Sequence, residues 1–138
     1  MKECCIIDAC AIIAFLKKEK GHETMLRFFS KADTGDILLS MHKLNLLEVY
    51  YGFYRDDGKK LAETVLADTL SLPISFINDI SSPVFREAGR LKTTYDISLA
   101  DSIALSMASV KKEPLITSDH HEFDKIESKE AIKFIWIR

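Results

Sequence analysis

The chain has 138 residues and a mass of 15.7 kDa, which is the size of a single domain. Hydrophobic residues make up 47% and charged residues 29%, and five Gly and three Pro are too few for a fibrous, disordered or linker-rich protein. The net charge of −2 excludes a strongly basic nucleic-acid-binding protein, so any binding to a polyanion must depend on a local patch or a bound cation.

Short apolar runs alternate with helical patterns along residues 1–138. The runs predicted as buried strands are Cys4–Ile7, Ile37–Leu39, Pro73–Phe76, Leu115–Thr117 and Phe134–Ile137. The predicted helices are Ala11–Leu16, Thr24–Ala32, His42–Arg55, Lys59–Leu70, Val84–Tyr95, Leu99–Val110 and a short segment near Phe123–Ile126. Strands that are apolar on both faces and separated by helices indicate a parallel sheet covered on both sides. We therefore predict one three-layer α/β/α domain with about five parallel strands.

Two helix boundaries carry a clear signal in the sequence. Ser82-Pro83 is typical of an N-cap followed by the first helical residue. The turn residues Asp56-Asp57-Gly58 are expected to separate two helices.

The three cysteines lie close together near the N-terminus, at Cys4, Cys5 and Cys10. An odd number in one segment provides no disulfide framework, and we interpret it as typical of a reducing cytoplasm. A zinc site shared with His120 and His121 would match no known ligand spacing, so buried small side chains are favoured. The apolar run that leads to Asp8 is too short for a membrane span and precedes no cleavage site, so we expect no membrane segment.

Two carboxylates directly follow predicted strands. Asp8 comes after the first strand and Asp119 after the fourth. In a parallel α/β sheet the ligand crevice lies beyond the carboxyl ends of the strands, so both side chains are expected there. Each acid on its own could equally be the N-cap of the next helix.

Two further carboxylates lie in helices that are apolar on most faces, Glu48 in Leu44–Tyr51 and Asp101 in Leu99–Leu105. A buried carboxylate has to be protonated, paired or bound to metal. Asp101 could instead complete a capping box with Ser98. Glu48 could lie on an exposed edge or pair with Lys43 or Arg55.

The four carboxylates together predict a cation site. Four such groups near one end of a sheet cannot all remain ionised without a cation, because each charge raises the pKa of the others. Oxygen ligands of this kind favour Mg²⁺ or Mn²⁺.

Four sequence segments resemble the PIN-domain nucleases, in particular the VapC-type toxins of toxin–antitoxin pairs. They are Ile-Ile-Asp8-Ala-Cys-Ala-Ile-Ile-Ala, Leu-Asn-Leu-Leu-Glu48-Val-Tyr-Tyr-Gly, Ile-Ser-Leu-Ala-Asp101-Ser-Ile-Ala-Leu-Ser-Met-Ala and Leu-Ile-Thr-Ser-Asp119. The resemblance implies the strand order 3-2-1-4-5 and an acidic Mg²⁺ or Mn²⁺ pocket formed by Asp8, Glu48, Asp101 and Asp119. It also implies cleavage of single-stranded RNA, a homodimer and an inhibitory antitoxin.

The sequence departs from the family pattern at two places. Cys10 stands where many relatives have a hydroxyl residue that orients water. The segment His120-His121-Glu122-Phe123-Asp124 shifts the spacing of a second acidic residue, so the pattern leaves open whether Glu122 or Asp124 assists.

In such a nuclease, Asp8 and Asp101 would bind the cation, and Glu48 and Asp119 would complete its coordination shell directly or through water. The hydroxyl of Thr117 or Ser118 could orient such a water. Candidate phosphate contacts are the side chains of Lys17, Lys18, Lys43, Arg55, Arg86 and Arg90, each of which could equally be a solvated surface charge. The aromatic cluster Tyr50, Tyr51, Phe53 and Tyr54 is interpreted as core or dimer surface rather than as a base-stacking platform.

Two other functions share these residues. One is an RNA-processing PIN nuclease without an antitoxin, and the other is a non-catalytic PIN-like binding module, which would have no need of four costly carboxylates. A phosphoacceptor domain is disfavoured, because it requires a second acid beside Asp8 and a Lys after the last strand.

Overall fold

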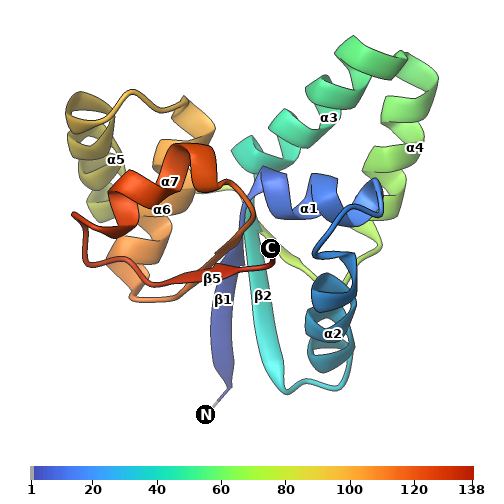
Figure 1. Ribbon diagram of the computed structural model, residues 1–138, viewed down its shortest axis with the longest axis horizontal. Helices are drawn as coiled ribbons and strands as arrows, with labels where there is room; N and C mark the ends of the chain where they lie inside the picture. The colour runs from blue at the N-terminus through green and yellow to red at the C-terminus, as the bar shows by residue number, and fades with distance from the viewer. Residues whose placement is uncertain (1) are drawn as a thin grey trace.

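The computed structural model describes residues 2–138, which form one five-stranded parallel sheet between helices (Figure 1). The strands are β1 (Glu3–Ile7), β2 (Ile37–His42), β3 (Ser75–Ile77), β4 (Leu115–Thr117) and β5 (Phe134–Trp136). The helices are α1 (Ala9–Leu16), α2 (His22–Asp33), α3 (Lys43–Asp57), α4 (Lys59–Leu70), α5 (Ser82–Thr94), α6 (Leu99–Lys111) and α7 (His120–Glu127). The strand order is β3-β2-β1-β4-β5, so the predicted three-layer architecture and strand order are confirmed.

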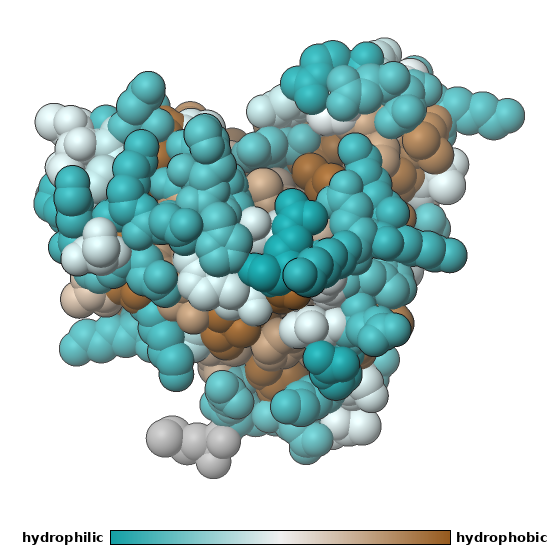
Figure 2. Space-filling view, viewed as in Figure 1, coloured by the Kyte–Doolittle hydropathy of each residue, from teal (hydrophilic) through white to brown (hydrophobic). Residues whose placement is uncertain are grey.

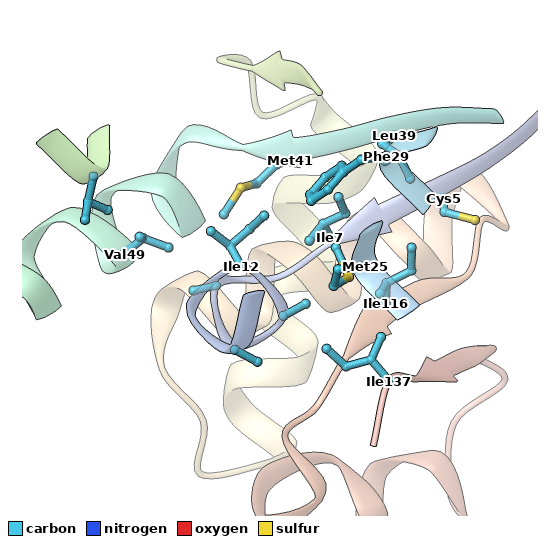
Figure 3. Close-up of a cluster of buried hydrophobic side chains, with 14 of the residues drawn as sticks. Cys5, Ile7, Ile12, Met25, Phe29, Leu39, Met41, Val49, Ile116 and Ile137 are labelled. Carbon is cyan, nitrogen blue, oxygen red and sulfur yellow. The ribbon is translucent and has the colours of Figure 1, made fainter. Parts of the chain in front are cut away.

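Each face of the sheet carries its own apolar core. Successive strand residues point to opposite faces, so Cys5 and Ile7 enter one cluster and Ile6 enters the other. The first cluster is covered by α1, α2, α3 and α4, and Figure 3 shows Ile12, Met25 and Phe29 from α1 and α2 around the strand residues of this cluster. The second cluster is covered by α5, α6 and α7. Burial of both faces explains why the strands have no alternating polar pattern.

Several element boundaries differ from the sequence prediction, each for a local reason. The N-cap of α5 is Ser81 rather than Ser82, because the Ser81 hydroxyl accepts a hydrogen bond from the Val84 amide. The third strand begins at Ser75 rather than Pro73, because the Ile74 amide donates to the Leu72 carbonyl in a tight turn.

The start of α3 and the α3–α4 turn also follow from local chemistry. His42 belongs to β2 rather than to the helix, and its imidazole Nδ1 caps α3 by accepting from the Leu44 amide at 3.0 Å. Gly58 separates α3 from α4 at a φ of 94°, which favours glycine, so the predicted turn is confirmed.

The carboxyl ends of β1 and β4 lie side by side at the centre of the sheet, because Ile7 is paired with Ile116. The chain leaves β1 through Asp8 into α1, and leaves β4 through Asp119 into α7. Figure 2 shows the surface notched between the side formed by α5, α6 and α7 and the side formed by α3. In the described part of the chain, no helix is long and apolar enough to cross a bilayer.

Candidate active site

Asp8 is a fully enclosed carboxylate at the end of the central strand, with an exposed fraction of 1%. Its Oδ1 accepts a hydrogen bond from the Ala11 amide at 2.9 Å, and its Oδ2 accepts one from the Thr117 hydroxyl. Burial raises the pKa of Asp8 to about 7, against the opposing effect of these two bonds, and the nearby charges of Asp101 and Asp119 add to the rise. Asp8 is therefore an N-cap and also a member of a charged cluster.

Asp119 is held beside Asp8 by the same threonine. The Asp119 amide donates to the Thr117 hydroxyl oxygen at 3.1 Å, and Asp119 Oδ1 caps α7 by accepting from the Glu122 amide at 3.1 Å. Thr117 thus ties together the two strand-end carboxylates that the sequence assigns to the crevice.

Asp101 lies in the first turn of α6, and it is partly buried. Its amide donates to the Ser98 hydroxyl oxygen at 3.1 Å, but within residues 2–138 the Ser98 amide donates no hydrogen bond to the Asp101 carboxylate. Burial raises the pKa of Asp101 to about 7. The charges of Glu48 and Asp119 add to the rise, and a hydrogen bond with Ser98 opposes it. Only the Ser98 side-chain half of the predicted capping box forms, and the Asp101 carboxylate lies within electrostatic reach of Glu48 and Asp119 instead.

Glu48 and Asn45 lie one turn apart on α3 and leave polar atoms without protein partners. Asn45 has an exposed fraction of 1%, yet neither its Oδ1 nor its Nδ2 has a hydrogen-bond partner among the described residues, and the same holds for Glu48 Oε2. Burial raises the pKa of Glu48, and the charge of Asp119 adds to this effect. Buried atoms of this kind need water or an ion as a partner.

The thiol of Cys10, on the first turn of α1, lies within electrostatic reach of all four carboxylates. It donates to Asp119 Oδ2 at a sulfur–oxygen distance of 3.7 Å. Burial raises the pKa of Cys10, and the charges of Asp8, Asp119, Asp101 and Glu48 raise it further, in that order. Asp119 therefore contacts this thiol directly, and the charges of Asp8, Glu48 and Asp101 reach it as well.

The carboxylate pocket, defined by Asp8, Glu48, Asp101 and Asp119, has donors suited to a hard divalent cation. Within residues 2–138, no three His, Cys, Asp or Glu side chains lie close enough to form a ready-made metal site. The donor set nevertheless fits Mg²⁺ or Mn²⁺, because it consists of carboxylate oxygens, one of them unpartnered, and such ions retain several waters.

The predicted phosphate-binding side chains are scattered over the surface, and several already have partners. Arg90 bridges Glu87 at 2.7 Å and Glu130 at 2.6 Å. Arg55 pairs with Asp56, Arg86 donates to Ser82, Lys17 lies over the Phe53 ring, and Lys43 is exposed on the first turn of α3. None of these contacts draws the cations toward the four acids.

The two acids after Asp119 take different positions. Glu122 lies near the site, since its charge contributes to the raised pKa of Asp101. Asp124 accepts from His120 Nδ1 at 2.7 Å, and the His120 ring stacks on Trp136 with 3.8 Å between centroids. The side chain of His121 is exposed, and its Nε2 lies 3.8 Å from Glu122 Oε1.

Two residues of the site had no clear sequence signal. Cys10 differs from the family pattern and gave no reason to expect a central thiol, and Asn45 is one amide in an apolar helix. Its position three residues before Glu48, on the same helical face, is the feature that could have identified it.

Comparison with known proteins places the chain in a structural context. Residues 5–129 match the family model described as PIN domain. A comparison with curated protein sequences finds no match.

Several solved structures share the fold at low sequence identity. VapBC from Salmonella typhimurium, solved bound to DNA, is 14% identical over 100% of both chains with a TM-score of 0.74. VapBC2 from Rickettsia felis, bound to a promoter DNA fragment, is 17% identical over 96% of this chain and 97% of that chain, with a TM-score of 0.71. The sarcin–ricin-loop-cleaving toxin VapC20 from Mycobacterium tuberculosis is 14% identical over 88% of this chain and 94% of that chain, with a TM-score of 0.67.

Proposed function

Since the chain belongs to the PIN domain family, we propose that it is a Mg²⁺- or Mn²⁺-dependent endoribonuclease and the toxin of a type II toxin–antitoxin pair. The observation that supports the proposal is the pairing of Asp8 and Asp119 through Thr117 at the carboxyl ends of β1 and β4, beside a Cys10 thiol that donates to Asp119 and that the charges of Glu48 and Asp101 also reach. Burial raises the pKa of Asp8, Glu48 and Asp101, and acids with raised pKa values in a cleft are typical of a functional site.

Asp8 and Asp101 are the residues that we assign as the main cation ligands, with Glu48 and Asp119 completing the shell directly or through water. Burial makes the ionised forms of Asp8 and Asp101 unfavourable, so a cation would recover free energy at both. A bound divalent ion would lower the pKa of a coordinated water and neutralise charge on the phosphate.

The surrounding residues fix the carboxylates in place. The Ala11 amide and the Thr117 hydroxyl hold both oxygens of Asp8, and the Glu122 amide holds Asp119. Such partners orient ligands and tune their affinity for metal. Asn45, with its unpartnered amide one turn from Glu48, is suited to hold a water beside that carboxylate.

The proposed partners are RNA, a cognate antitoxin and a second copy of the chain. The antitoxin is supported by the structural neighbours, which were solved as toxin–antitoxin complexes. The homodimer is supported by exposed apolar side chains on α3, α5 and α6: Leu47, Tyr51, Phe85 and Leu99. Free thiols at all three cysteines fit a cytoplasmic location, as does an RNA substrate.

The test is sequencing of new RNA ends after the purified protein is incubated with total cellular RNA. Wild type with Mn²⁺ or Mg²⁺, wild type with EDTA, and the Asp8→Asn and Asp101→Asn variants are compared, with Asp33→Asn on the exposed end of α2 as a matched control. We expect 5′-phosphate ends that require metal, occur with the control and disappear in both pocket variants.

Identical ends from wild type and the pocket variants would refute catalysis by these carboxylates and favour a binding module. Cleavage of ribosomal or transfer RNA by a chain with no antitoxin-binding activity would favour the RNA-processing nuclease.

A further inference from the structure

Two adjoining hollows lead away from the carboxylate pocket. The first, about 430 Å³ in volume, begins at Cys10 and Asp119 and is also lined by Arg138. The second, about 510 Å³, is lined by cations from the α1–α2 connection and from α2, namely Lys18, Lys20 and Arg27. Glu19 lines both, so the hollows adjoin. Each has a volume within the range of ligand sites.

The fold brings these hollows together through one close backbone contact. Gly21, the N-cap of α2, has a φ of 104°, and a Cβ at this position would lie 2.8 Å from the Ile137 carbonyl oxygen. The segment after β5 therefore packs directly on the α1–α2 connection, and Figure 1 shows the C-terminal end beside these helices. His22 fixes the connection from the other side, since its Nδ1 lies 2.8 Å from the Phe15 carbonyl oxygen and its ring stacks on Phe15.

The resulting surface is locally positive on a chain whose net charge is −2. Its four cations, which we call the basic track, are exposed; they are Lys18, Lys20, Arg27 and Arg138. Three carboxylates line the same hollows, namely the exposed Glu19 and Glu23 and the partly buried Asp119. Figure 2, in the same view as Figure 1, shows hydrophilic side chains gathered over this region.

Among residues 2–138, the track contains one ion pair, and it is easily exchanged. Arg138 Nη1 lies 3.6 Å from Glu19 Oε1, with exposed fractions of 39% and 43% for the two side chains. Exposed pairs of this kind contribute little stability, so a phosphate could replace Glu19 as the partner of Arg138.

We propose that single-stranded RNA leaves the carboxylate pocket along the basic track, with its phosphates contacting Arg138 first and then Lys18, Lys20 and Arg27. This proposal rests on the proposed ribonuclease function, which it deepens by identifying where the strand beyond the cut site is held. The carboxylates repel a polyanion, and the track supplies the attraction that they lack, whether or not a cation is bound. A single strand can follow such a groove because its backbone carries one charge per nucleotide.

The test is fluorescence anisotropy with labelled oligouridine of about 20 nucleotides, long enough for several phosphate contacts. EDTA is present throughout, so that binding is measured without metal-dependent cleavage. The track variant combines Lys18→Gln, Lys20→Gln and Arg138→Gln. Its matched control, which also loses three charges, combines exchanges to Gln at three exposed lysines that line neither hollow: Lys111, Lys129 and Lys133.

We expect the track variant to bind roughly tenfold more weakly at moderate salt, and the slope of log affinity against log salt to fall by about 2, the contribution of three single-strand phosphate contacts. The control should retain the wild-type affinity and slope, apart from the small general effect of net charge. Equal losses in the two variants, or no detectable binding of the oligonucleotide by wild type, would overturn the proposal, whatever occupies the track instead.

The result is separable from the proposed function. Loss of binding in the track variant alone, combined with no metal-dependent cleavage by wild type, would support the track and refute the nuclease. Metal-dependent cleavage by wild type, combined with unchanged RNA binding by the track variant, would support the nuclease and refute the track.

Discussion

Replacing Asp8 by Asn is expected to stabilise the metal-free protein at alkaline pH, although Asp8 caps α1. Asn keeps an oxygen that can accept from the Ala11 amide, so the cap is retained. Burial raises the pKa of Asp8 from 3.8 to about 7, so the unfolded chain loses this proton before the folded one does. The resulting contribution to stability is therefore complete below the unfolded pKa and is lost as pH rises through about 7. Relative to strongly acidic pH, the free energy of unfolding is therefore lower by about 2 kcal/mol at pH 5 and by about 4 kcal/mol at pH 8.

The measurement is urea unfolding at pH 5 and pH 8 in EDTA for wild type, Asp8→Asn and the Asp33→Asn control. We predict that the stability of wild type relative to Asp8→Asn falls by roughly 2–3 kcal/mol between pH 5 and pH 8. The exposed control should follow wild type at both values. Parallel pH dependence of wild type and Asp8→Asn would refute the argument that burial of this carboxylate dominates its energetics.

Three further substitutions test the packing, the chain path and the site. Phe123→Ala empties a fully buried position on the inner face of α7 and should lower the free energy of unfolding by about 3–5 kcal/mol in urea; a loss below about 1 kcal/mol would contradict the packing. Gly21→Ala places a Cβ against the Ile137 carbonyl oxygen at a φ of 104°, so thermal unfolding should reveal a loss of about 1–3 kcal/mol, and unchanged stability would argue against that close approach. Glu48→Gln keeps the side-chain size but removes its charge, and should lower the rate of metal-dependent RNA cleavage roughly 10- to 100-fold; a wild-type rate would remove Glu48 from the site.

The sheet was predictable because its strands are buried on both faces. Leu115–Thr117 and Lys59–Leu70 have the same bounds in the prediction and in the structure, since apolar periodicity and turn residues mark both ends. The boundaries that shifted depend on local hydrogen bonds, such as the Ser81 cap and the His42 cap, which composition and periodicity do not encode.

The placement of Asp8 and Asp119 at the carboxyl ends of β1 and β4 was predictable for a similar reason. Asp8 and Asp119 follow strands whose ends must meet in a parallel sheet, and Glu48 and Asp101 stand out as the acids of apolar helices. The role of neighbouring residues depends on tertiary placement instead. Arg138 follows β5 and lies 3.6 Å from Glu19. No sequence pattern predicts this contact, because it depends on the packing of Ile137 against Gly21.

Binding of Mn²⁺ to the purified protein, followed by electron paramagnetic resonance of the free ion, tests the central claim most directly. The four carboxylates are proposed to form the metal centre, so wild type and the Asp33→Asn control should bind Mn²⁺ with the same affinity. Asp8→Asn and Asp101→Asn should each weaken binding by at least roughly tenfold, the smallest effect typical of disturbing a metal site. Equal Mn²⁺ affinity in all four proteins, or no binding by wild type, would contradict the assignment of this pocket as a metal-dependent active site.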